Sequence, residues 1–133
     1  MFEVVFDYGE HDPATPTPSD TGTWLYRADP FSSYRAGFEL RTTRLCRRVL
    51  RFHHFPGERD VGADCLVRST DFAYSHEEDP SDARNSVYTF LRAVTQAGYH
   101  RRDGGDERRN LPPVEFHYSL PEVADRGNDR LSR

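Results

Sequence analysis

The chain has 133 residues and a mass of 15.4 kDa, which is about the size of one domain. Its 18 basic residues are all arginine and its net charge is −4, which excludes lysine-based catalysis and argues against nucleic-acid binding. The 9 Phe, 7 Tyr and 1 Trp exclude a disordered acidic segment. No apolar run reaches the ~18–20 residues of a membrane helix, and the start lacks the pattern of a signal peptide. We therefore expect a globular domain, or a piece of one, without membrane insertion.

Apolar and polar residues alternate in three segments, at 4–9, 70–75 and 114–119. Alternation with period two is typical of a half-buried β-strand. Each segment contains the tripeptide Phe-x-Tyr followed by Gly or Ser. We predict that the aromatic side chains of these tripeptides are structural and pack in the wall of a sheet: Phe6, Tyr8, Phe72, Tyr74, Phe116 and Tyr118. The alternative is chance recurrence, because aromatic residues favour any half-buried strand.

Two of the three tripeptides follow an earlier apolar segment, which indicates a repeated unit. Residues 45–49 precede Phe72, and residues 91–94 precede Phe116. The unit would be a strand, a long polar loop and a second strand that ends in Phe-x-Tyr. The sequence therefore predicts a mainly β fold built from antiparallel strand pairs with long polar loops. Helix should be limited to a turn or two.

Four polar stretches separate the predicted strands, at 10–23, 75–86, 102–110 and 122–133. They are rich in Pro, Gly, Asp or Ser, which is typical of loops, and the third contains the turn sequence Asp-Gly-Gly-Asp at 103–106. Residues 122–133 have few apolar side chains. We expect them to form a poorly anchored tail after a single fragment that covers residues 1–121.

The segment 38–55 is compatible with two structures. As a helix it would place several arginines on one side and Leu45, Val49 and Phe52 on another. Its aromatic and β-branched residues, and the β context around it, favour strands instead. We predict strands with a bulge near Thr42 and Thr43.

Four residues in the middle of the chain are possible zinc ligands: Cys46, His53, His54 and Cys65. Their spacing matches no common zinc pattern, and neighbouring histidines on a strand point to opposite faces. We expect no metal at these residues and two partly buried thiols, with a Cys46–Cys65 disulfide as the alternative. The sequence contains no nucleophile elbow, metalloprotease motif or phosphate-binding loop, so we expect no cofactor and no catalytic residue.

Five arginines lie close together, at 41, 44, 47, 48 and 51. They could form a binding patch for an anionic partner. Because the chain is acidic overall, we expect them instead to pair with the acidic loops and to spread over both strand faces.

A long block of the sequence resembles a known family. It includes Asp-Pro-Phe-Ser-Ser-Tyr at 29–34, Phe-Glu-Leu-Arg-Thr at 38–42 and Phe-His-His-Phe at 52–55. Residues 2–11, 66–75 and 111–119 extend the match to most of the chain. The block is similar to the SpvB/TcaC-type N-terminal region, which is shared by the virulence protein SpvB and by the B components of insecticidal toxin complexes, such as TcaC and TcdB.

This resemblance implies a parent protein many times longer. In the toxin complexes, strand-rich segments of the B component build, together with the C component, a hollow Rhs/YD-like β-shell. The shell encloses a toxic polypeptide before delivery through the pore of the A component. By resemblance, the partners are the rest of the parent chain and the toxin-complex C and A components. The location is secreted or extracellular, or the host cytoplasm for an SpvB-like effector.

The resemblance brings no enzyme activity to this segment. SpvB ends in a separate ADP-ribosyltransferase domain, whose Glu-x-Glu pair is absent from these residues. We therefore expect a non-enzymatic structural segment of a shell. The alternative is an arginine-lined module that binds an anionic partner, which salt-dependent binding to a phosphate polymer would reveal.

Overall fold

The computed structural model describes residues 1–102 and 105–119. Its elements in chain order are β1 (Phe2–Asp7), β2 (Tyr26–Ser33), β3 (Leu40–Arg44), β4 (Arg48–Phe55), β5 (Gly62–Tyr74), α1 (Ser75–Glu78), the 3-10 turn η1 (Ala83–Ser86), β6 (Leu91–Arg102), β7 (Gly105–Asn110) and β8 (Val114–Glu115). All strand pairings are antiparallel, and the helical elements are one turn each. The predicted mainly β fold is confirmed.

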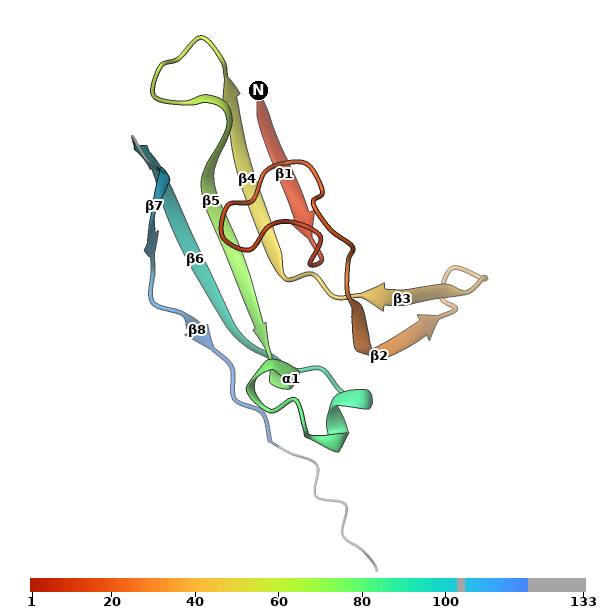
Figure 1. The fold of residues 1–133 in the computed structure, drawn as a ribbon. Helices are drawn as coiled ribbons and strands as arrows, with labels where there is room; N and C mark the ends of the chain where they lie inside the picture. The colour runs from red at the N-terminus through yellow and green to blue at the C-terminus, as the bar shows by residue number, and fades with distance from the viewer. Residues whose placement is uncertain (103–104, 120–133) are drawn as a thin grey trace, which may run out of the picture.

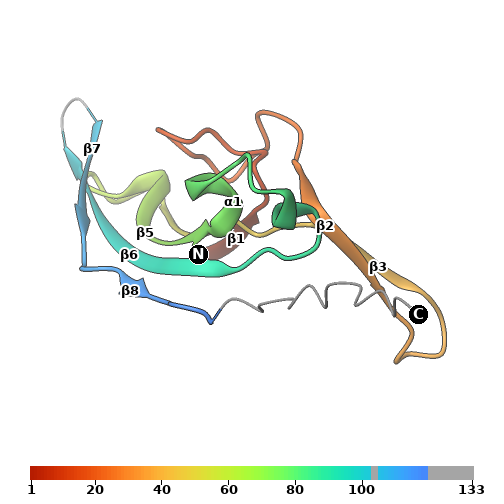
Figure 2. The same ribbon diagram turned by 90° about the horizontal axis from the view of Figure 1, so that it is seen from below.

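Most strands form one open six-stranded sheet in the order β1-β4-β5-β6-β7, with β8 paired to the start of β6. Figure 1 shows that the sheet is long and twisted, and that β2 and β3 form a separate two-stranded arm that projects from one end of it. Seen from below, the sheet is curved, with β7 turned up along one edge (Figure 2). The sheet does not close, because β1 has no second neighbour among the described residues.

One face of the sheet carries a small core. Leu50 and Phe52 of β4 are fully buried and contact Leu66 of β5, while Val5 and Tyr99 pack against this cluster. Residues 8–25, which connect β1 to β2, fold back over the same face as an irregular loop (Figure 1). The predicted loop at 10–23 is therefore confirmed.

The segment 38–55 forms strands, as predicted, and a register shift lies opposite Thr43, where the bulge was predicted; a second irregularity follows it. The chain leaves the arm at Arg44 and enters the main sheet at Arg48, so the break falls at residues 45–47. The bulge lies in the partner strand, where the residues between Tyr26 and Phe31 face a much shorter stretch of β3. Because the two sheets run in different directions, the chain must leave the strand conformation at residues 45–47. No local pattern in the sequence predicts this break.

Two predicted loops are wrong in part. Residues 102–110 were expected to be a loop, but Gly105–Asn110 form strand β7, paired with β6. The connection between β4 and β5 is also short, because β5 begins at Gly62 and takes up most of the expected loop. Polar side chains mark β7 because it is an edge strand, and charged edges discourage further pairing. Residues 103–104 of the predicted turn and the predicted tail at 122–133 lie outside the described residues.

The third Phe-x-Tyr segment is not a full strand. Strand β8 ends at Glu115, and Phe116 N makes one further backbone hydrogen bond to Arg92 O at 2.8 Å. Strand β6 begins at Leu91, so only one residue of β6 lies beyond Arg92 for further pairing with this segment. The predicted pairing of the two apolar segments with the later strands is nevertheless present, since Val49 faces Thr70 and Val94 faces Val114.

Candidate functional site

The junction between the main sheet, the loop and the arm is held by one buried ion pair. Asp7, the last residue of β1, is 1% exposed and accepts a hydrogen bond from Arg48 Nε at 2.6 Å. The other guanidinium nitrogens of Arg48 donate to the carbonyl oxygens of His11, Asp12 and Pro13 at 3.0–3.4 Å. Arg48 therefore connects the start of β4 to the end of β1 and to the loop that covers the core.

The carboxylate of Asp7 is held in its charged form. Burial by itself would raise the pKa of Asp7, but the backbone N–H of Gly9 and the guanidinium of Arg48 outweigh it and hold the pKa below its ordinary value. Gly9 has φ 109°, and a Cβ at this position would lie 3.2 Å from Leu25 Cγ, so the turn after β1 requires glycine. The local backbone and Arg48 therefore stabilise Asp7 in its charged form.

A second set of contacts fixes residues 45–47 against the end of β5. The Tyr74 hydroxyl donates to the carbonyl oxygen of Cys46 at 2.6 Å, and Phe72 N donates to Arg47 O at 2.9 Å. Burial, followed by the nearby Cys46, raises the pKa of Tyr74 to about 12. The Arg47 guanidinium pairs with Glu77 of α1, whose other oxygen accepts from Tyr74 N at 2.9 Å. The break between the two sheets is therefore rigidly supported.

The arm has its own polar support at the bulge of β2. Asp29 accepts two hydrogen bonds from Arg27, at 2.9 and 3.1 Å, and a third from Thr89 N at 2.9 Å. Burial opposes ionisation of Asp29, but these bonds outweigh it and hold its pKa below the ordinary value. Because Thr89 lies just before β6, Asp29 anchors the base of the arm to the main sheet. The bulge of β2 therefore contains a residue, Asp29, that ties the arm to the main sheet.

Three of the five clustered arginines have different partners. The predicted pairing with an acidic loop is confirmed for Arg47, whose partner Glu77 lies in the 75–86 stretch. Arg48 pairs instead with Asp7 of β1, and Arg44 lies over the Trp24 ring at 4.3 Å from its centroid. The cluster is therefore divided between the core face, the helix and the arm.

The six predicted wall aromatics occupy different environments. Tyr74 is buried, Tyr8 and Phe72 are half-buried, and Phe6 is 58% exposed. Phe116 and Tyr118, after β8, are 37% and 40% exposed. Tyr118 nevertheless stays close to the sheet, since its hydroxyl donates to the carbonyl oxygen of Leu91 at 2.8 Å. The structure therefore does not bring the six side chains together in one cluster.

Large apolar side chains are exposed at several places, and two of these are groups of neighbouring residues on β1 and on the arm. On the face of β1 opposite the core, which we call the outward face, they are Phe2, Val4 and Phe6. Along the arm they are Tyr26, Phe31, Tyr34, Phe38 and Leu40. Each of these side chains is at least half exposed. Groups of exposed large apolar side chains are uncommon on the surface of a soluble monomer. These surfaces are the strongest candidates for contact with other protein segments.

The four possible zinc ligands of the sequence have separate environments. Cys46 and Cys65 are free thiols, the first half-buried and the second buried. His53 contacts the Phe2 ring, whereas His54 lies between Glu3, at 2.8 Å, and Asp64, at 3.0 Å. Burial is the main reason why the pKa of the Cys46 thiol is raised.

The residues that organise the junction, Asp7 and Arg48, are not among the site residues predicted from the sequence. Asp7 followed by Gly9 is a recognisable signal for a turn that closes on an aspartate side chain. Arg48 has no such signal, because five neighbouring arginines look alike in the sequence and only the fold selects one of them.

The fold places this chain in a class with solved toxin-complex structures, to which it is similar over most of its length. The chain resembles the crystal structure of TcdB2-TccC3-Cdc42 with a TM-score of 0.67 and 35% identity, over 88% of this chain and 5% of that one. The structure of TcdB2-TccC3 without its hypervariable C-terminal region gives the same TM-score, identity and coverage.

The second resemblance is to SpvB. Residues 1–55 match the family model described as Salmonella virulence plasmid 65kDa B protein. Mono(ADP-ribosyl)transferase SpvB of Salmonella typhimurium is 51% identical over 116 residues, and that of Salmonella choleraesuis (strain SC-B67) is 43% identical. The N-terminal domain of effector protein SpvB from Salmonella typhimurium matches with a TM-score of 0.57 and 41% identity, over 74% of this chain and 29% of that one.

These matches confirm the resemblance of this segment to the SpvB and toxin-complex B type of region. The alignments with the curated relatives cover 84% of this chain but 17% of the length of those relatives. The solved SpvB structure that matches is its N-terminal domain. Among the described residues, no helix is long and apolar enough to cross a membrane.

Proposed function

We propose that this segment is a non-enzymatic structural part of a toxin-complex B component or of an SpvB-like virulence protein, where it contributes to a β-shell that encloses a toxic polypeptide for delivery. The observation that carries the proposal is the likeness of the fold, over 88% of the chain, to the TcdB2-TccC3 assembly. The exposed members of the six predicted wall aromatics, Phe6, Phe116 and Tyr118, would then contact neighbouring strands of the shell.

The distribution of apolar side chains supports this role. Among the described residues, the buried apolar side chains are few: Leu50, Phe52, Cys65, Leu66, Tyr74 and Ala97. The outward face and the arm expose more large apolar side chains than this core buries. In a shell, neighbouring segments of the parent chain would cover these groups, and the burial would repay about 25 cal/mol for each Å² removed from water.

The proposed partners follow from the same likeness. The rest of the parent chain would cover the outward face, and a C component would complete the shell; the presence of TcdB2 and TccC3 in the same solved structures supports this proposal. Secretion, and for an SpvB-like effector entry into a host cell, are part of this proposal. The binding of an anionic partner by the clustered arginines is less well supported, because Arg47 and Arg48 are already paired with carboxylates.

The proposal can be tested by placing one charge on the outward face. Phe6→Asp should leave the unfolding free energy of the 133-residue chain within about 0.5 kcal/mol, because Phe6 is exposed there. In the full-length parent protein the same change should prevent assembly with the C component, measured by size-exclusion chromatography, and should expose the enclosed polypeptide to protease. Phe52→Ala is the control that should destabilise both proteins.

A parent protein that tolerates Phe6→Asp as well as the 133-residue chain does would contradict the shell proposal. The face would then be solvent-exposed in the whole protein as well. A parent that assembles normally but loses affinity for phosphate polymers when Arg44 and Arg51 are replaced by Gln would favour the anionic-partner alternative.

A further inference from the structure

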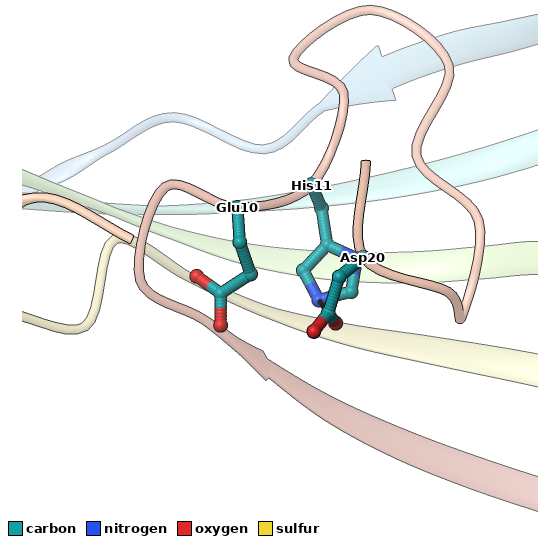
Figure 3. A group of neighbouring side chains, drawn as sticks. All are labelled: Glu10, His11 and Asp20. Carbon is teal, nitrogen blue, oxygen red and sulfur yellow. Dashed lines mark ion pairs between the residues drawn. The ribbon is translucent and has the colours of Figure 1, made fainter. Parts of the chain in front are cut away.

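The loop between β1 and β2 brings two acidic residues and a histidine together. Thr21 N and Gly22 N both donate to the carbonyl oxygen of Glu10 at 2.9 Å, so the two ends of the loop are tied to each other. This places Asp20 beside Glu10 and His11. Figure 3 shows the three side chains pointing the same way, with the histidine ring beside the Asp20 carboxylate.

The ring of His11 is buried and has a defined orientation. The residue is 5% exposed, and its backbone N–H donates to Asp7 Oδ1 at 3.3 Å. Ring atom Nδ1 lies 3.0 Å from the carbonyl oxygen of Thr17. Because a carbonyl oxygen can only accept, Nδ1 carries the proton in this bond. The other ring nitrogen, Nε2, therefore presents a lone pair in the neutral ring.

That lone pair is directed at negative charge. Nε2 lies 3.6 Å from Asp20 Oδ1, which is longer than a hydrogen bond, and the ligand atoms of Glu10, His11 and Asp20 all lie within 4.8 Å of one another. The His11 side chain is 2% exposed, and a divalent cation between Nε2 and the two carboxylates would be bound by all three groups. Among the described residues, this is the group of His, Asp and Glu side chains whose donor atoms converge in this way.

We propose that Glu10, His11 and Asp20 bind one divalent metal ion of the zinc type through one imidazole nitrogen and two carboxylate oxygens. Ligand atoms that share a tetrahedral zinc at about 2.0–2.1 Å lie about 3.4 Å apart, so Nε2 and Asp20 Oδ1 already have a suitable separation. The Asp20 side chain is 74% exposed, so it can rotate to bring its carboxylate to the position that the ion requires. Water would complete the coordination.

Two features of the site favour zinc over calcium or magnesium. An imidazole ligand suits zinc, whereas calcium and magnesium prefer oxygen ligands only. The bond from Nδ1 to Thr17 O is the type of support that usually orients a histidine ligand of zinc. The charge of the ion would also neutralise the two carboxylates. The hydrogen bond from Tyr8 N to Glu10 Oε2, at 2.7 Å, holds the first carboxylate in place and leaves it lone pairs for the metal.

The site would fix the loop that covers the core. Arg48 holds residues 11–13 of this loop, and the metal would join residue 20 to the same anchor. The ion is therefore structural in this proposal. It does not depend on the shell proposal, because it concerns the stability of the loop in the chain itself.

The test uses zinc chloride alone with the 133-residue chain, after removal of metals with a chelator. We expect one zinc per chain by isothermal titration calorimetry and an increase in the midpoint of thermal unfolding. His11→Gln removes the nitrogen ligand, and Asp20→Asn removes an exposed ligand without disturbing the core. Each should weaken zinc binding by about tenfold or more. Asp12→Asn is the matched control, since Asp12 lies in the same loop and outside the cluster.

The outcome of the control variant decides the assignment. Zinc binding that survives Asp12→Asn and is lost with Asp20→Asn supports the site. Zinc binding of equal strength in all four proteins would assign the ion to other residues, such as the thiols or His54, and would overturn the proposal. Absence of saturable zinc binding to the wild-type chain, or binding of calcium in preference to zinc, would overturn it as well.

Discussion

Val4 and Val5 are neighbours in β1, yet they face opposite environments: Val4 is 52% exposed on the outward face, whereas Val5 packs against the buried cluster of Leu50, Phe52 and Leu66. Adjacent residues of a strand point to opposite faces, so the two valines separate the core side of the sheet from its outward side. They also form a matched pair for measurement.

Replacement of each valine by threonine, which has nearly the same shape, should have unequal effects. Val5→Thr places a hydroxyl group against the core and should lower the unfolding free energy by about 1 kcal/mol, because the hydroxyl lacks a partner there. Val4→Thr should change it by less than about 0.5 kcal/mol. Urea unfolding followed by tryptophan fluorescence measures both. Equal effects would show that the two faces are wrongly assigned.

Removal of the buried charge pair should be costly. Arg48→Met leaves Asp7 charged and buried without its main partner, and should lower the unfolding free energy by about 3 kcal/mol. Arg51→Met on the same strand is the control, because Arg51 is exposed; its effect should stay within about 0.5 kcal/mol. If the two variants were equally stable, Arg48 would not be holding the loop on the sheet.

The carboxylates of Asp7 and Asp29 should make the unfolding free energy of the chain depend on pH in acid. The pKa values of Asp7 and Asp29 are lower in the folded chain than the ordinary value of 3.8, so between the folded and unfolded values the unfolded chain binds more protons. Their contribution to stability is present above about pH 4 and is lost as the pH falls through the folded pKa values. Asp7→Asn should flatten this dependence in urea unfolding measured from neutral to acidic pH. An unchanged slope would contradict the assignment.

The sequence predicted the class of fold because alternation is a local property. It could not tell which face of β1 is buried: Val4, Phe6 and Tyr8 are the large residues of one face, but the core lies on the face of Val5 and Asp7. That choice depends on Leu50 and Phe52, which are far away in the sequence. The strand β7 was missed for a related reason, since its charged residues are typical both of a loop and of an edge strand.

The candidate sites were harder to predict than the fold. His11 and Asp20 are separated by a proline-rich stretch with no recognised ligand spacing, and backbone hydrogen bonds to Glu10 bring them together. The arginine cluster gave no hint that Arg48 is the member that pairs with the buried Asp7. By contrast, the family resemblance was readable from the long block around residues 29–34, because an extended match is far more specific than a short motif.

The core and the exposed aromatics should differ in their contribution to stability. Phe52→Ala creates a cavity in the buried cluster and should cost about 3–5 kcal/mol. For Phe116, a cost of that size would require burial; since Phe116 is 37% exposed, we expect about 1–2 kcal/mol for Phe116→Ala. Urea unfolding with light scattering measures both, and Glu78→Ala serves as the surface control. A larger loss for Phe116 than for Phe52 would mean that the main core lies elsewhere.

Alkaline pH should test the support of the break between the two sheets. Burial and the neighbouring Cys46 raise the pKa of Tyr74 to about 12, above its ordinary value of 10.0. Between these two values the folded chain binds more protons than the unfolded chain, so stability is complete below about pH 10 and declines as the pH rises towards 12. Tyrosinate absorbance should show one group that ionises late, and this group should be missing in Tyr74→Phe.

The same substitution separates the titration from the hydrogen bond. Tyr74→Phe removes the hydroxyl that donates to the carbonyl oxygen of Cys46, and should cost about 1–3 kcal/mol at neutral pH because that carbonyl loses its donor. The variant should also lose the part of the alkaline decline that belongs to Tyr74. Tyr34→Phe on the exposed arm is the control and should leave both quantities unchanged. A Tyr74→Phe variant as stable as the wild type would show that residues 45–47 are held by the backbone bond from Phe72 and the ion pair of Arg47 alone.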